Sequence, residues 1–175
     1  MIKFCRQCGQ KVSYAIPSGD TLERAICSSC SYIDYENPRI ITGILPIYKD
    51  EVLLCKRAIE PAKNKWTIPS GFMECNETVE EGALREAQEE AGISPKIKQL
   101  YGIYNLTRIH QVYLLYLGIL PSKHYQSGIE TTTIRFFHVN ELPWKNIAFS
   151  AVVFVLRNYL SDYKNQKFLL RTGSE

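Results

Sequence analysis

Three glutamates, Glu86, Glu89 and Glu90, stand at positions i, i+3 and i+4 of the segment 78–91. On an α-helix these positions project from one face, so the three carboxylates would lie together and repel one another. Hard divalent cations such as Mg²⁺ or Mn²⁺ take oxygen ligands and would hold them together. The spacing therefore predicts a divalent-metal site and chemistry on phosphate. The alternative interpretation is a solvated surface helix with an acidic face.

A second set of candidate metal ligands consists of two Cys-x-x-Cys pairs, Cys5 with Cys8 and Cys27 with Cys30. This spacing is typical of a four-thiolate zinc site, and because all four ligands are protein groups the zinc would be structural. Two disulfides would instead require an oxidising compartment. A redox motif would usually be single and lie at the start of a helix.

Capping residues and the spacing of apolar residues predict the helices and strands that must position these groups. Thr78 is the expected N-cap of the acidic helix, Glu81 completes a capping box, and Gly92 ends the helix after residue 91. A second helix is expected over 148–163, where apolar residues recur at helical spacing. Alternating or continuous apolar runs predict strands at 40–48, 52–56, 66–68, 97–106, 111–119 and 134–139.

Length, composition and net charge limit the classes of protein to which the chain can belong. The chain has 175 residues, 45% of them hydrophobic, and a net charge of +3, which is too mild to predict a nucleic-acid or membrane partner. No apolar run reaches the roughly 20 residues of a membrane span, and the N-terminus lacks an apolar signal core. We therefore expect a soluble cytoplasmic protein in a reducing compartment.

The acidic segment resembles the Nudix box, G-x5-E-x7-R-E-U-x-E-E-x-G-U, in which U is apolar. Ala87 and Ile93 stand at the U positions, and every fixed position is filled, by Gly71, Glu77, Arg85, Glu86, Glu89, Glu90 and Gly92. The resemblance implies an α+β fold, the Nudix α/β/α sandwich with a mixed sheet, over residues 38–163. A small four-cysteine zinc ribbon is expected over 1–37, and residues 164–175 are expected to form a C-terminal tail.

Roles follow from the same resemblance. It implies that Glu86, Glu89 and Glu90 bind catalytic Mg²⁺ or Mn²⁺. The expected catalytic set is Glu86, Glu90 and Glu130. The general base is either Glu86 or Glu130, and Glu130 would lie on a downstream loop.

The remaining motif residues are expected to act structurally. Arg85 should tie down Glu77 and point away from the metal face, while Gly71 and Gly92 shape the ends of the motif. Arg57, at the end of a predicted strand, is a candidate phosphate contact. Tyr104, Phe72 and Phe149 are alternative candidates for the aromatic side chain that stacks against a base or flavin ring.

The wider pattern resembles the zinc-ribbon Nudix pyrophosphatases, which include plant plastid enzymes acting on FAD and ADP-ribose. It is carried by the ribbon, Asn37-Pro38 and the stretches 54–57, 66–71 and 148–150. The resemblance implies hydrolysis of FAD to FMN and AMP, or of ADP-ribose to AMP and ribose 5-phosphate, by an enzyme whose partner is a small nucleotide. Homodimers are common in this group.

Other functions remain open at this stage. NADH is disfavoured because the Ser-Gln-Pro-Trp-Pro-Phe-Pro stretch of NADH-cleaving relatives is missing, and a proline that often accompanies ADP-ribose specificity is replaced near Arg108. Dinucleoside polyphosphates and dNTPs are alternative substrates. A Nudix-based ligand-sensing regulator is the rival class of function, although regulators typically lose box glutamates that this chain keeps.

Overall fold

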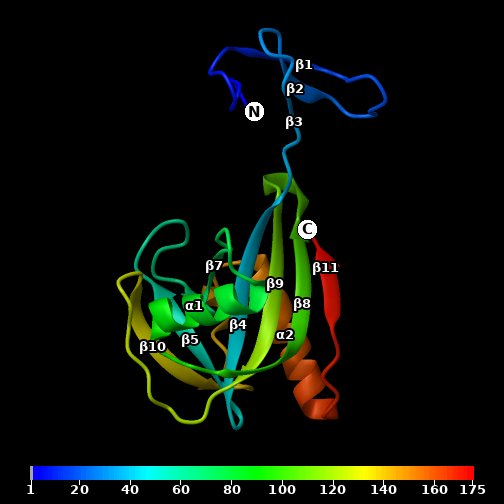
Figure 1. The fold of residues 1–175 in the computed structure, drawn as a ribbon. Coiled ribbons are helices and arrows are strands. Elements are labelled where there is room, and N and C mark those ends of the chain that lie inside the picture. Colours follow the sequence, from blue (N-terminus) through cyan, green and yellow to red (C-terminus); the bar gives the residue numbers. More distant parts are fainter. Residues whose placement is uncertain (1) are drawn as a thin grey trace. The chain divides into compact units, whose positions relative to one another are not determined.

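A computed structural model describes residues 2–175, which separate into two compact units, Met1–Pro38 and Arg39–Glu175 (Figure 1). The predicted boundary is residue 37, one residue earlier. Arg39 is the first residue of the larger unit because its backbone N–H donates to the carbonyl of His110 and begins a long strand.

The N-terminal unit is a three-stranded antiparallel sheet of β1 (Val12–Ala15), β2 (Arg24–Cys27) and β3 (Ile33–Asp34). In the turn between β1 and β2, the Asp20 N–H donates to the Pro17 carbonyl. The buried residues of the unit are few and small, mainly Cys5, Ala25 and Cys27. A core of this size is too small to hold about 35 residues together without a further cross-link.

The larger unit is built on one mixed sheet. Along the sheet the strands run β10-β5-β4-β9-β8-β11, with β6 paired to β5 and β7 paired to β4. Neighbours are antiparallel except β4 with β9 and β8 with β11. The strands are β4 (Arg39–Tyr48), β5 (Glu51–Arg57), β6 (Trp66–Thr67), β7 (Ser70–Phe72), β8 (Lys96–Leu106), β9 (Gln111–Ile119), β10 (Thr131–His138) and β11 (Arg171–Ser174).

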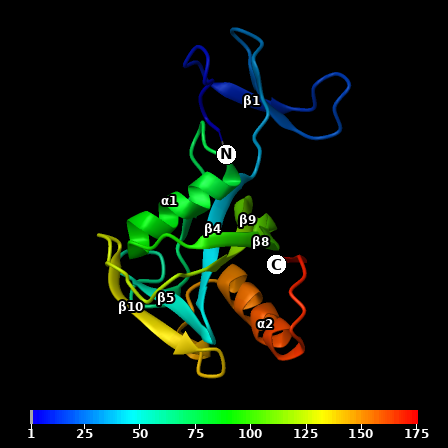
Figure 2. The same cartoon turned by 60° about the horizontal axis from the view of Figure 1, so that its bottom comes forward.

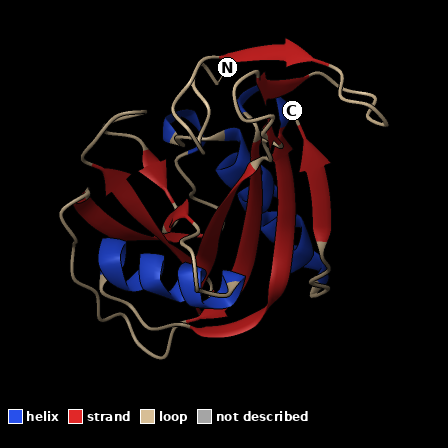
Figure 3. Cartoon of the chain, turned by 45° about the horizontal axis from the view of Figure 1, so that its top comes forward, coloured by secondary structure: helices blue, strands red, loops and turns tan. Residues whose placement is uncertain are grey.

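Two helices cover opposite faces of this sheet, as Figures 2 and 3 show. Helix α1 (Val79–Ala91) packs Ala83, Ala87 and Ala91 on one face. Helix α2 (Ser150–Asn165) packs Val152, Val155 and Leu156 on the other. Short 3₁₀ turns occupy Thr107–Ile109 (η1) and Trp144–Asn146 (η2). The predicted α/β/α sandwich with a mixed sheet is confirmed.

The ends of α1 follow local chemistry, as predicted. Thr78 accepts a hydrogen bond from the Glu81 backbone, and the Glu81 side chain accepts one from the Thr78 backbone, which completes the capping box. Gly92 closes the helix in the left-handed region with φ of 60°. No helix in residues 2–175 has the length and apolar character that crossing a membrane would require.

Strands β4 and β5 form a fork, the feature of the sheet that matters most for the site. The two strands pair only at Ile47–Val52 and Tyr48–Glu51, next to their connecting turn. Beyond that point β5 pairs with β6 and β10, while β4 pairs with β7 and β9. The sheet therefore opens between β4 and β5 at the end that lies beside α1.

The C-terminal region differs from its prediction in two ways. Helix α2 begins at Ser150 rather than 148, because the Ala148 N–H donates to the Trp66 carbonyl and holds that residue against β6. Residues 164–175, predicted as a tail, complete α2 and add β11, which pairs in parallel with β8. Local sequence gives little sign of this strand, since Arg-Thr-Gly-Ser has no apolar alternation.

A buried carboxylate, Asp162, anchors this C-terminal region. It accepts hydrogen bonds from Tyr101 Oη (2.8 Å), from the Leu169 N–H (3.4 Å) and from Arg171. Burial alone would raise the pKa of Asp162, but the bonds from Arg171 and Tyr101 outweigh it and the pKa lies below its usual value.

We expect Asp162→Asn to lower the free energy of unfolding by about 2 kcal/mol, because hydrogen bonds to a buried charge are lost. A carboxylate with a lowered folded pKa stabilises the fold above its unfolded pKa of about 3.9, and this contribution is lost as pH falls further. Urea denaturation at neutral pH and near pH 3 would measure both effects. Glu141→Gln, an exposed change of the same charge, is the control. Equal stability of the two variants at neutral pH would contradict the prediction.

Candidate active site

A cleft of about 970 Å³ opens at the fork between β4 and β5. Its walls differ in chemistry at the two ends. Carboxylates line the end beside α1, namely Glu74, Glu86, Glu89, Glu90 and Glu130. Apolar and aromatic side chains line the rest, including Ile41, Phe72, Leu106, Ile109, Tyr113 and Phe149. A cleft of this size and character suits a small molecule with one strongly anionic part.

The three α1 glutamates do converge on this cleft, at different depths. Glu90 is only 8% exposed, and within residues 2–175 the one hydrogen bond to its carboxylate comes from the Ser70 N–H, at 3.2 Å. Glu86 lies against Gly71, where an added Cβ would fall 2.3 Å from Glu86 Oε1. Glu89 stands at the rim with its side chain 58% exposed. A side chain at position 71 would therefore displace the Glu86 carboxylate from its place.

The electrostatics of this cluster favour a bound cation. The pKa of Glu90 is raised to about 8, chiefly by burial and also by the negative charges of Glu86 and Glu130, while the hydrogen bond from the Ser70 N–H and the charge of Arg57 oppose the rise. Burial also raises the pKa of Glu86. Buried like charges are costly unless positive charge neutralises them. The donor set, carboxylate oxygens facing a cleft, fits hard divalent ions, and it suits Mg²⁺ and Mn²⁺ alike.

Arg85 is the positive centre of the motif, and its surroundings correct one expectation. Its Nε and Nη2 donate to the two oxygens of Glu77, both at 2.9 Å, and Nη2 also donates to the Phe72 carbonyl at 3.1 Å. Its Nη1 donates to Glu86 at 2.8 Å and to Glu89 at 2.9 Å. The prediction that Arg85 points away from the metal face is wrong, because the planar guanidinium bridges Glu77 to two of the candidate ligands.

Glu77 is fixed from two sides. Hydrogen bonds from Arg85 and from the Glu74 N–H lower the pKa of Glu77 to about 2, so it stays ionised across the physiological range. Glu77 Oε1 also lies 2.6 Å from the place a Cβ on Gly82 would take. The loop before α1 is therefore tied to the helix through one ion pair.

Glu130 reaches the carboxylate cluster although it lies forty residues after Glu90 in the sequence. Its loop docks on the end of α1, where the Gln126 and Gly128 N–H groups donate to the carbonyls of Ala91 and Glu90. A Cβ on Gly128 would lie 1.8 Å from the Glu89 carbonyl, so only glycine permits this approach. The structure thus brings both candidate bases, Glu86 and Glu130, to one end of the cleft.

Arg57 lies on the opposite wall, at the end of β5. Its guanidinium stacks over Phe149 at 5.1 Å from the ring centroid, and its Nε donates to the Pro61 carbonyl at 2.8 Å. Arg57 lines the cleft together with Glu90 and Tyr113, and its charge offsets part of the rise that burial causes in the pKa of each. A cation held in this way is suited to meet a phosphate.

Two of the three aromatic candidates for stacking against a base line the cleft, and the third lies in the core. Phe72 and Phe149 line the cleft, whereas Tyr104 packs in the core against Phe154 at a centroid distance of 4.9 Å. Sequence reasoning missed Tyr113 and Gln111, which line the cleft from β9. They share one face of that strand, but which strands lie beside it depends on long-range pairing that local patterns do not encode.

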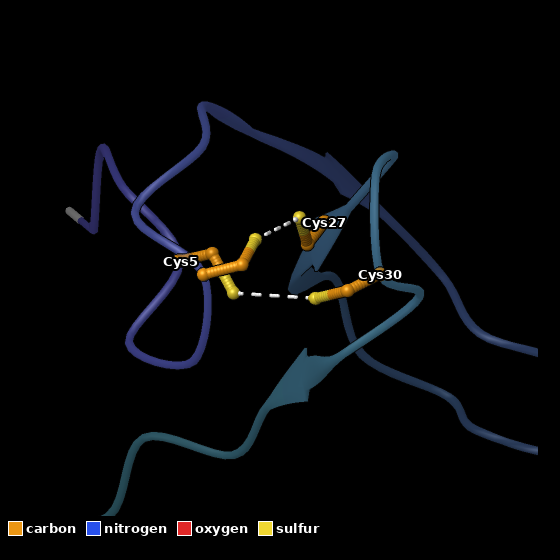
Figure 4. Close-up of side chains that lie close together, drawn as sticks. Cys5, Cys27 and Cys30 are labelled. Carbon is orange, nitrogen blue, oxygen red and sulfur yellow. Dashed lines mark hydrogen bonds between the residues drawn. The ribbon is translucent and has the colours of Figure 1, made fainter.

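The four cysteines of the N-terminal unit form one cluster, and their ligand sulfurs all lie within 4.8 Å of one another. Cys5 Sγ lies 3.7 Å from Cys30 Sγ, and Cys8 Sγ lies 3.4 Å from Cys27 Sγ (Figure 4). Tetrahedral zinc with Zn–S bonds near 2.3 Å requires sulfurs about 3.8 Å apart. The cluster fits this geometry.

The two knuckles that carry these cysteines are alike. The N–H of Gly9 donates to the Cys5 carbonyl, and that of Ser31 donates to the Cys27 carbonyl. Both residues have positive φ, 73° for Gly9 and 58° for Ser31, so the second knuckle accepts a serine where glycine is favoured. Backbone N–H groups of Cys30 and Ser29 lower the pKa of Cys27 to about 7, which favours the thiolate that zinc requires.

Comparison with protein families divides the chain as the structure does. A model described as "NUDIX domain" matches residues 37–155, and one described as "Nudix N-terminal", a zinc ribbon, matches residues 3–36. The first covers more than half of the chain.

Individual relatives agree with the family models. An ADP-ribose pyrophosphatase of Methanocaldococcus jannaschii is 36% identical over 115 residues, which span 62% of this chain and 67% of the relative. The mouse diphosphoinositol polyphosphate phosphohydrolase 3-alpha is 37% identical over 73 residues, only 41% of this chain and 43% of that protein.

A solved structure matches both units. The NUDIX hydrolase from Nitrosomonas europaea is 44% identical, with a TM-score of 0.94 and coverage of 99% of each chain. Together with the glutamates of the box assembled on one cleft, these matches show that the chain belongs to the Nudix family, as a Nudix pyrophosphatase with an N-terminal zinc-ribbon unit.

Proposed function

We propose that the protein hydrolyses a nucleoside diphosphate linked to a second moiety, and that ADP-ribose is the favoured substrate, cleaved to AMP and ribose 5-phosphate. The main support is the cleft, whose acidic end suits a diphosphate and whose apolar end suits a planar base. The archaeal relative named as an ADP-ribose pyrophosphatase supports the same substrate. FAD is the second candidate, since its adenosine diphosphate half is identical.

In this proposal the residues that line the cleft have different roles in catalysis. Glu86, Glu89 and Glu90 hold divalent Mg²⁺ or Mn²⁺, which when bound supplies positive charge against the diphosphate and lowers the pKa of water. Either Glu86 or Glu130 accepts the proton of the attacking water. Arg57 contacts a phosphate oxygen from the opposite wall, and Arg85 holds Glu86 and Glu89 in position.

The first test is a substrate panel with Mg²⁺ or Mn²⁺, comprising ADP-ribose, FAD, NADH, diadenosine polyphosphates and dNTPs. We expect AMP release from ADP-ribose to exceed that from the others. We expect Glu89→Gln and Glu90→Gln each to reduce turnover by about 10²-fold or more, because a ligand charge is lost beside the reacting phosphate.

The matched control is Glu80→Gln, an exposed glutamate on the same helix that does not line the cleft. It should keep wild-type turnover. Wild-type rates in both Glu89→Gln and Glu90→Gln would refute their assignment as ligands. Tight binding of ADP-ribose without hydrolysis would instead favour a ligand-sensing regulator.

Arg85 gives a prediction that does not depend on the substrate. Lysine cannot replace its five-donor geometry, so Arg85→Lys should leave Glu86 and Glu89 less well held and their repulsion less neutralised. We expect a lower Tm without metal than the wild type has, and a larger rise in Tm when Mn²⁺ is added. Differential scanning calorimetry with and without Mn²⁺ measures both. Arg157→Lys, an exposed change on α2, is the control, and an unchanged metal-free Tm in Arg85→Lys would contradict the idea.

We also propose that the cysteine cluster holds one structural Zn²⁺, because the unit has too few buried apolar residues to fold otherwise. The full chain should contain one zinc per molecule by atomic emission, and Cys27→Ser should lose it. Near-stoichiometric zinc in Cys27→Ser would count against this site. Cys75→Ser, which changes an exposed cysteine outside the cluster, should retain the metal.

A further inference from the structure

The apolar end of the cleft is a wall built by three neighbouring strands. Ile41 of β4 pairs with Tyr113 of β9, and Leu106 of β8 pairs with Gln111 of β9. Gln111 and Tyr113 are two residues apart, so their side chains project from the same face of β9. Ile41, Leu106 and Tyr113 are buried residues of one core cluster that also line the cleft. They give the cleft an apolar wall against which a ring can pack.

Gln111 places a polar group at the edge of this surface. Its side chain lines the cleft and is half-buried. The hydrogen bonds within residues 2–175 include none to its carboxamide, in contrast to Asn105 on the neighbouring strand, whose amide donates to the Gly173 carbonyl. A carboxamide offers one acceptor and two donors. An amide left free beside an apolar wall can therefore give a ligand direction and specificity.

The wall and the carboxylates belong to the same cleft and are connected through a short path. Gly71 touches Glu86, and the next residue, Phe72, pairs with Ile41 of the wall. Arg57 lines the same cleft as Glu90 and Tyr113. A diphosphate at the carboxylates would thus direct the nucleoside to which it is attached toward the wall and Gln111.

We propose that Gln111 is a specificity-determining residue that hydrogen-bonds the Watson–Crick edge of a purine lying on the wall of Ile41, Leu106 and Tyr113. This inference rests on the proposed function, because it assumes that the diphosphate occupies the acidic end. Adenine presents an amino donor next to a ring-nitrogen acceptor, and the carbonyl and NH₂ of a carboxamide match this pair. The ring contacts the wall and the amide recognises its edge.

The test compares ADP-ribose with inosine diphosphate ribose, whose base carries a carbonyl and a ring N–H in place of the adenine pair. Gln111→Leu removes the amide at similar size, and Gln111→Glu leaves only acceptors. We expect Gln111→Leu to lower kcat/KM for ADP-ribose by about 10-fold, mostly through KM, as for the loss of a bidentate base contact. We expect Gln111→Glu to lower kcat/KM for both substrates, because a carboxylate has no donor for the adenine ring nitrogen or for the inosine carbonyl, whereas a carboxamide can turn to match either base.

Gln88→Leu, an exposed glutamine of α1, is the matched control and should keep the wild-type ratio. All variants are compared by their thermal midpoints, so that a misfolded protein is recognised. Wild-type kcat/KM values for ADP-ribose in both Gln111 variants would overturn the role of Gln111. Failure of the wild type to hydrolyse either substrate would instead refute the proposed function, so the two failures are distinguishable.

Discussion

Negative charge concentrated on one turn of α1 is the constraint on which the rest of the larger unit depends. Glu86 and Glu90 are partly or wholly buried, and burial raises the pKa of both. Such a cluster persists only where positive charge balances it. Arg85 supplies one such charge and is itself fixed by Glu77. Arg85 thus bridges Glu77 to Glu86 and Glu89 and balances part of the negative charge on this helix face.

The fork between β4 and β5 leaves a cleft beside these carboxylates. A sheet paired along its whole length would leave the α1 carboxylates facing packed strands. The two strands separate beyond the two residue pairs next to their connecting turn. The space between them is therefore lined by the carboxylates on one side and by the wall of Ile41 and Tyr113 on the other. Glycines at 71 and 128 let backbone and carboxylate approach where a Cβ would collide. The cleft thus joins two chemistries that suit the two halves of a nucleoside diphosphate.

The N-terminal unit differs from the larger unit because its apolar core is very small. Its three short strands bury little apolar surface, and its four cysteines supply the cross-link that a larger core would otherwise provide. The two knuckles repeat one hydrogen-bonding pattern, so the sulfurs are directed inward by backbone geometry rather than by packing. The proposed zinc would link the stability of this unit to metal, whereas the stability of the larger unit comes from two layers of apolar packing on its sheet.

The sequence by itself determined the features that depend on neighbours along the chain. The limits of α1, its capping box, its glycine stop and the convergence of Glu86, Glu89 and Glu90 all follow from helical spacing, and the cysteine pairs follow from short knuckles. Only the tertiary structure decided what surrounds them. The contacts of Arg85 to Glu86 and Glu89, the pairing of β11, and the place of Gln111 beside Leu106 depend on rotamers and on strand neighbours far apart in sequence. Such pairings are selected by burial of the whole sheet, a global quantity that no local pattern contains.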